Sequence, residues 1–157
     1  ADGARAIRSD ITVLSAYRGN WDDAGAGKEQ ALAQIARRAD VIFQNADAAG
    51  LGVFQAVRES RGVWVVGSNA DQNGIAPDVT LGSVVIDVAH AFLLLATEVK
   101  SGTFKPRVVR YDTASDVVLW VANPAVAAVP ASMNARIDST RARFVRHELP
   151  LLGAPTP

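Results

Sequence analysis

The stretch from residue 63 to residue 73, VWVVGSNADQN, constrains the fold more than any other part of the chain. Val63 to Gly67 are typical of a buried strand, and they run directly into the polar cluster Ser68 to Asn73. A short apolar run bounded by turn residues is typical of a central parallel strand. Ligands of open α/β sheets bind beyond the carboxyl ends of such strands. The polar cluster therefore predicts either one wall of a ligand site or a solvated loop that caps the next element.

The composition indicates a globular domain without a charged surface that would select a polyanion. The chain has 157 residues, of which 49% are hydrophobic and 20% are charged, within the range of a folded single domain. Sixteen basic residues balance sixteen acidic ones, so we expect no nucleic-acid partner. The arginines between residues 136 and 146 are interpreted as a solvated helix face.

Several kinds of catalytic or metal site are disfavoured by missing residue types. The chain lacks cysteine, which removes disulfides, thiolate catalysis and zinc–thiolate sites. His90 and His147 are its only histidines, and neither lies in a metal-binding pattern. We therefore predict no metal.

Motifs for cofactor binding and nucleophilic catalysis are also missing. The sequence contains no GxxxxGK[ST] and no GxSxG, and Gly50-Leu51-Gly52 lacks the third glycine of a dinucleotide fingerprint. We expect no cofactor. Carboxylates such as Asp22, Asp23, Asp47 and Asp71 could act as acid and base, but nothing pairs them with a nucleophile. An enzyme is therefore the less favoured hypothesis.

The first half of the chain alternates strands and helices. Residues 1 to 9 look like the end of a helix, and the strands are predicted at 11–17, 41–43 and 63–66, with helices at 24–38 and 48–60 between them. This order is typical of right-handed βαβ units. The predicted fold class is α/β, a parallel sheet with helices on both faces.

The second half adds a strand and changes character after Gly102. A turn at 73–78 leads to a strand at 80–85 and a long helix at 86–100, whose apolar face holds Val88, Phe92, Leu95 and Val99. Beyond a boundary near 102–106, we predict strands at 107–111 and 117–121 as a hairpin, a helix at 131–148, and a frayed tail from residue 153. The predicted division is a ligand-binding lobe, 1–105, and a C-terminal segment, 106–157.

Polar or aromatic residues follow the first three predicted strands, at 17–21, 44–47 and 68–72. The carboxyl ends of parallel strands share one edge of a sheet, so this convergence favours a ligand site over a solvated loop. Trp21 lies outside any helical apolar stripe and could offer a flat face to a planar ligand, although a core or lid tryptophan is the alternative. Asp22 or Asp23 is expected to cap the following helix.

Two long runs resemble the basic-membrane-protein (PnrA-like) family of ABC-transporter solute-binding proteins. They are GNWDDAGAGKEQALAQIARRADVIFQNADAAGLGVFQA and VGSNADQNGIAPDVTLGSVV. The family has an aromatic-x-D element, a GKE-A helix, a GADVIF strand with a glycine-rich end, a GVDSDQ loop and a TSVVK step in the same order. The resemblance is close over residues 1 to 105 and looser beyond them.

The resemblance implies a fold, a cargo and partners. It implies one Rossmann-like lobe of a type I periplasmic binding protein, in which two lobes close on a purine nucleoside or a related heterocycle without chemistry. A missing first lobe would precede residue 1, and an ABC permease would be the transport partner. The protein would be an exported periplasmic or cell-surface lipoprotein, and the isolated lobe could form a homodimer.

Carried over by position, the resemblance also implies site residues and departures from the pattern. Trp21 stands where the family has the stacking aromatic, and Asn45 to Gly50 where it has a glycine-rich turn, with only the first and last positions of AGGTG kept at Ala46 and Gly50. Asn69 replaces an aspartate expected to bind ribose hydroxyls, and Ile86 replaces its companion lysine. Loss of that pair removes a charge-assisted clamp on a diol.

These departures lead to a prediction about the ligand. Asp47 adds a carboxylate that the family lacks, so a heterocycle with N–H donors, such as a purine base, is favoured over a ribonucleoside. The predicted ligand-binding residues are Trp21, Asp22, Asn45, Asp47, Gly50, Asn69, Asp71 and Gln72. The alternatives are a sensor or signalling lobe that has lost transport, and an enzyme on a doubly wound sheet.

Overall fold

The computed structural model describes residues 2–17, 19–127, 129–146 and 148–149. The helices are α1 (Asp2–Ile7), α2 (Ala24–Ala36), α3 (Gly50–Glu59), α4 (Val88–Lys100) and α5 (Ala131–Val145), with short 3₁₀ turns η1 (Asp47–Ala49) and η2 (Thr113–Ser115). The strands are β1 (Val41–Phe43), β2 (Trp64–Asn69), β3 (Thr80–Ile86) and β4 (Val118–Ala122). The predicted frayed tail from residue 153 lies outside the described residues.

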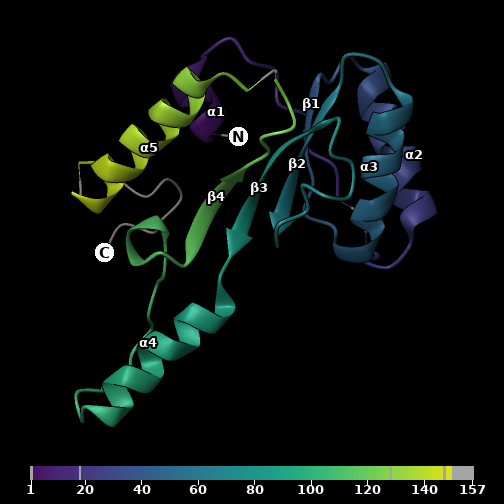
Figure 1. Ribbon diagram of the computed structural model, residues 1–157. Coiled ribbons are helices and arrows are strands. Elements are labelled where there is room, and N and C mark those ends of the chain that lie inside the picture. Colours follow the sequence, from purple (N-terminus) through teal and green to yellow (C-terminus); the bar gives the residue numbers. More distant parts are fainter. Residues whose placement is uncertain (1, 18, 128, 147, 150–157) are drawn as a thin grey trace.

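The strands form one sheet in the order β1-β2-β3-β4 (Figure 1). The first three are parallel and β4 is antiparallel to β3. Figure 1 shows α2 and α3 side by side next to β1 and β2, with α1 and α5 near β4. The predicted α/β class, a parallel sheet flanked by helices, is confirmed.

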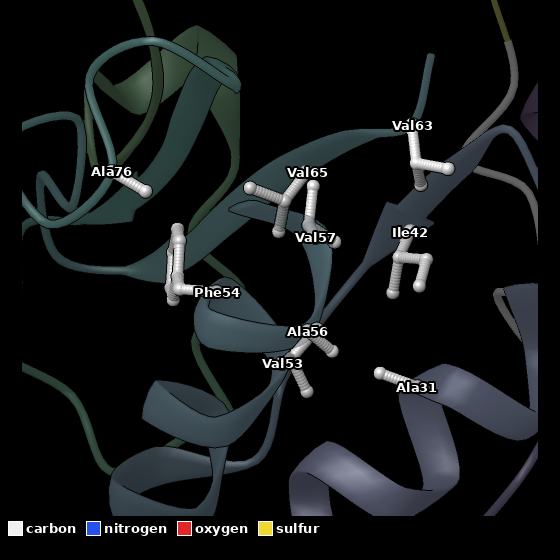
Figure 2. Packing of buried hydrophobic residues seen from close by; sticks show 9 residues of the cluster. All are labelled: Ala31, Ile42, Val53, Phe54, Ala56, Val57, Val63, Val65 and Ala76. Carbon is white, nitrogen blue, oxygen red and sulfur yellow. The ribbon is translucent and has the colours of Figure 1, made fainter. Parts of the chain in front are cut away.

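The core lies between the sheet and the α2–α3 pair. Figure 2 shows side chains from α2, α3, β1 and β2 pointing toward one another, with Phe54, Val57 and Val65 almost fully buried. Glycines let the two helices approach closely, because a Cβ on Gly27 would lie 2.0 Å from the oxygen of Ala49 and one on Gly52 would lie 1.8 Å from that of Ala24. The helix pair is thus fixed by backbone contact as well as by apolar burial.

Helix α2 begins where the sequence predicts a cap. Asp23, rather than Asp22, is the N-cap, and its carboxylate accepts a hydrogen bond from the N–H of Ala26 at 2.9 Å. An acceptor at this position satisfies an N–H that has no partner inside the helix.

Two predicted strands are wrong. Residues 11–17 and 107–111 have no strand structure, and neither segment takes part in the strand pairings that supply the ladder hydrogen bonds of the sheet. The second segment follows α4, which projects away from the sheet in Figure 1. The predicted hairpin is therefore also wrong: β4 pairs with β3 instead, with Val121 opposite Ser83.

One strand is longer than its apolar run. We predicted 63–66, but β2 continues to Asn69, whose register partner is Val85. The backbone ladder persists through Gly67 and Ser68 because pairing depends on main-chain groups and not on side-chain polarity. Polar side chains therefore occupy the last positions of the strand itself.

Candidate functional site

A cavity of about 180 Å³ is lined by Ala16, Tyr17, Asn20 and Trp21, by helix α2 and by the carboxyl end of β1. Its polar lining residues are Tyr17, Asn20, Gln30, Gln34, Gln44 and Asn45, and its aromatic ones include Trp21 and Phe43. Two of the three polar segments predicted to converge, 17–21 and 44–47, thus meet around one space.

Gln44 joins the carboxyl ends of β1 and β2. Its side chain is 4% exposed. Its Nε2 donates to Oε1 of Gln72 at 2.6 Å, and its Oε1 accepts from the N–H of Ala46 at 3.1 Å. Gly50 leaves room for this amide, since a Cβ there would lie 2.3 Å from Oε1 of Gln44. The third predicted segment, 68–72, is therefore tied to the second.

Asn45 and Asn69 form a second link across the same strand ends. Nδ2 of Asn69 donates to Oδ1 of Asn45 at 3.1 Å, and both residues are exposed. The φ angle of Asn69 is 68° and that of Asp47 is 50°, in the left-handed region that Asn and Asp tolerate better than other side chains. Backbone held in sparsely populated regions is concentrated at ligand sites.

The loop after β2 is anchored to β3 and β4. The N–H of Gln72 donates to Oγ of Ser83 at 3.0 Å, and that hydroxyl donates to Oδ1 of Asn73 at 2.9 Å. Nδ2 of Asn73 reaches the oxygen of Val121 at 3.3 Å. All four strands are thus connected, directly or through this loop, with the contacts to β3 and β4 at the paired residues Ser83 and Val121.

Trp21 lies at the surface of the cavity with 57% of its area exposed. A core role for this tryptophan is therefore wrong. Its backbone oxygen accepts from the N–H of Ala49 at 2.8 Å, which fixes the segment against the start of α3. The ring remains available to a planar ligand.

The other predicted residues lie outside the lining of the cavity. Asp22, Asp47 and Asp71 are exposed, and the carboxylate of Asp71 accepts from the N–H of Asn73 at 3.0 Å. Gly50 is buried. Of the eight predicted site residues, Trp21 and Asn45 line the cavity, whereas Asn69 and Gln72 reach it only through their hydrogen bonds to Asn45 and Gln44.

Several lining residues are absent from the eight predicted ligand-binding residues. Gln44 directly follows the apolar run of β1, a position that could have identified it. Gln30 and Gln34 are one helical turn apart on α2, but their orientation toward the cavity depends on how α2 packs against α3, which spacing alone does not give.

The described residues contain no group of three or more His, Cys, Asp or Glu side chains placed to hold a metal ion. In the same part of the chain, none of the helices combines the length and apolar character required to cross a bilayer.

Sequence comparisons find relatives of known family. The chain is 28% identical over 150 residues to "Basic membrane protein A" of Borreliella afzelii, covering 94% of this chain and 46% of the relative. It is 31% identical over 118 residues to "ABC transporter nucleoside-binding protein BmpA" of Lactococcus lactis subsp. cremoris, covering 65% and 34%. The chain thus spans less than half the length of these relatives.

Solved structures share the fold. One described as an ABC transporter solute-binding protein from Conexibacter woesei matches with a TM-score of 0.75 and 22% identity, over 96% of this chain and 49% of the other. A transcriptional activator of the comK gene from Bacillus halodurans matches with a TM-score of 0.81 and 22% identity, over 94% and 51%. The family model for ABC transporter substrate-binding proteins of PnrA-like type matches residues 1–142, and the chain belongs to this Bmp family, a family of binding proteins and not of enzymes.

Proposed function

We propose that the chain is the ligand-binding lobe of an ABC importer and captures a purine-type base or a nucleoside-like heterocycle without chemistry. The observation that carries the proposal is the convergence of Trp21 and the polar end of β1 around one cavity, with the end of β2 and the loop after it hydrogen-bonded to the residues that follow β1. The name of the Lactococcus lactis relative, a nucleoside-binding protein, supports the ligand class.

The chemistry of the edge favours a planar ring with N–H donors. Trp21 offers an exposed aromatic face, and Asn45 and Asn69 offer amide groups. Asp47 and Asp71 add carboxylate acceptors nearby, and Asp22 lies next to Trp21 in the chain. Asn69 and Ile86 carry no charge with which to clamp a ribose diol. A base is therefore the preferred ligand over a ribonucleoside.

A second lobe completes the proposed site. Ligand pockets are typically about 300–1,000 Å³, larger than the 180 Å³ cavity, so one wall is missing for an enclosed ligand. The relatives are about twice as long as this chain. We propose that residues 1–105 are the binding lobe, that 106–157 return toward a preceding first lobe, and that this lobe closes over the cavity.

Helix α4 supplies a surface for that first lobe. Phe92, Leu93 and Val99 are all more than 60% exposed, and α4 buries no residue against the rest of the described chain. We propose that this face packs on the first lobe, or on a second copy when the chain is isolated. The whole protein would act with an ABC permease and lie outside the cytoplasm as a periplasmic or cell-surface lipoprotein.

Calorimetric titration tests the ligand class. We expect guanine and hypoxanthine to bind more tightly than guanosine and inosine, in the chain itself and in a longer protein that includes the preceding lobe. Trp21→Ala should abolish binding, whereas Leu51→Ala, an exposed change on α3, should not. Stronger binding of the nucleosides would contradict the preference for a base.

Restoring the family's aspartate and lysine at positions 69 and 86 tests the preference for a base over a ribonucleoside. The double variant Asn69→Asp with Ile86→Lys should shift the preference of the chain toward guanosine, raising guanosine affinity relative to hypoxanthine affinity. Equal affinity of the double variant and the natural chain for guanosine would show that these positions do not select against ribose.

A sensor lobe is the second candidate. The loss of the charged pair at Asn69 and Ile86 leaves room for a receptor that no longer transports. The fold alone does not distinguish the two roles. Neighbouring genes for a permease and an ATPase would favour the importer, and uptake of labelled hypoxanthine lost on gene deletion would establish it.

A further inference from the structure

We propose that Gln72 is a positioning residue, which touches no ligand and instead fixes Asn45 and Asn69. This inference rests on the proposed binding function, and it reassigns a residue that the sequence alone suggests as a ligand contact.

The side-chain oxygen of Gln72 is fully used inside the protein. Oε1 accepts one hydrogen bond from Nε2 of Gln44 at 2.6 Å and another from the N–H of Ser68 at 2.9 Å. An amide oxygen has two lone pairs. No acceptor capacity at this atom remains for a ligand.

Each partner of Gln72 precedes one of the two asparagines. Gln44 is followed by Asn45, and Ser68 is followed by Asn69. Ser68 is held at both ends, because its own carbonyl accepts from the N–H of Ala70 at 2.8 Å. The oxygen of Gln72 thus sets the distance between the two strand ends that carry the asparagine pair.

The Gln72 oxygen lies in a closely packed environment with buried partners. A Cβ on Gly67 would lie 2.9 Å from Oε1 of Gln72 and 2.7 Å from Oγ of Ser83. Gln44 and Ser68 are both buried. Loss of the Gln72 oxygen would leave two buried N–H donors without their partner, and the strand ends must shift to find water or another acceptor.

Two substitutions separate positioning from direct contact. Gln72→Glu keeps the oxygen and removes the amide NH₂, whereas Gln72→Met removes the oxygen at nearly constant volume. Without ligand, nuclear magnetic resonance of the labelled chain should show the side-chain amide signals of Asn45 and Asn69 moved by Gln72→Met and little changed by Gln72→Glu. Gln55→Met, on the exposed face of α3, is the control and should move neither.

Titration with hypoxanthine completes the test. Gln72→Met should weaken binding about tenfold, which corresponds to roughly 1.4 kcal/mol, and Gln72→Glu should bind as the natural chain does. If Gln72→Glu loses as much affinity as Gln72→Met, the glutamine meets the ligand through its NH₂ and the inference fails. If no purine binds the natural chain, the proposed function fails for this chain, while the amide signals still decide the positioning.

Discussion

Helices α3 and α4 both carry apolar residues, and the more apolar of the two, α4, is the one left exposed. Six of the ten residues of α3 are buried against α2 and the sheet. The thirteen residues of α4 include none that is buried, and Figure 1 shows the helix projecting beyond the strands. Phe54 of α3 is 1% exposed and Phe92 of α4 is 68% exposed.

This difference shows that an apolar face predicts a helix but does not indicate which segment the helix packs against. Isolated helices of this length are marginal in water, and most of their stability comes from packing. Helix α3 has its partner within the chain. Helix α4 requires one from outside the described residues, which is the role proposed for a first lobe.

The same substitution in both helices should give the largest contrast. Phe54→Ala opens a cavity in the core and should lower the free energy of unfolding by about 3–5 kcal/mol. Phe92→Ala removes an exposed ring and should change it by less than about 0.5 kcal/mol. Urea denaturation followed by circular dichroism measures both, and equal losses would mean that α4 is packed in solution.

Glycine substitutions at the α2–α3 crossing should have the next largest effect. Gly27→Ala and Gly52→Ala place a Cβ about 2 Å from a backbone oxygen, and overpacking of this kind costs about 1–3 kcal/mol. Gly74→Ala is the control, because a Cβ there meets nothing within 4 Å. Thermal unfolding measures the midpoint of each variant. Equal midpoints for all three would mean that the α2–α3 crossing is loosely packed.

The two helix caps allow a matched comparison at lower energy. Asp23 accepts from the N–H of Ala26, and Asp87 accepts from the N–H of His90 at 2.8 Å. Asp23→Ala should lower the global free energy of unfolding by about 1 kcal/mol. Asp87→Ala should leave the global value unchanged and speed hydrogen exchange in the first turn of α4 only. A lower global free energy of unfolding for Asp87→Ala would mean that α4 unfolds together with the rest of the chain.

The smallest difference between α3 and α4 is expected in how their ion pairs affect stability at acidic pH. A hydrogen bond from Lys28 lowers the pKa of Glu59, and one from Arg107 lowers the pKa of Glu98. A lowered folded pKa stabilises the protein above the unfolded pKa, and this contribution is lost as pH falls through the folded value. Glu59→Gln, which breaks a link between α2 and α3, should flatten the acid limb of the stability profile.

The matching change in α4 should have no global effect. Glu98→Gln breaks only the pair between α4 and Arg107 of the following segment. Its profile of unfolding midpoint against pH should therefore overlay that of the natural chain. Flattening by both variants would contradict the separation of α3 and α4.

Local pattern predicted most elements because each depends on nearby residues. The α2 helix, its aspartate cap and the strands β1 to β3 follow from apolar spacing and turn residues. Residues 11–17 and 107–111 have the residue types of strands but take part in none of the pairings of the described sheet. Strand formation depends on a partner that can be distant in sequence, so propensity alone overpredicted both.

The candidate site also has features that the sequence predicts and features that it does not. Asn45, Asn69 and Gln72 follow apolar strands, so their position at the sheet edge could be predicted. The use of Gln72 could not, because it depends on Gln44 and Ser68 meeting one oxygen. The sequence also favours Trp21 as a ligand contact, which stays a prediction for this exposed ring.

The sequence by itself determined the α/β class, the helices α2 to α5 and the strands β1 to β3, and the polar residues at the strand ends, since these depend on periodicity and residue type over short distances. Only the tertiary structure decided which strands pair, that α4 is left uncovered, and that the buried Gln44 connects β1 to Gln72 in the loop after β2. These features depend on contacts between segments far apart in the chain, where geometry and not local propensity selects the partner.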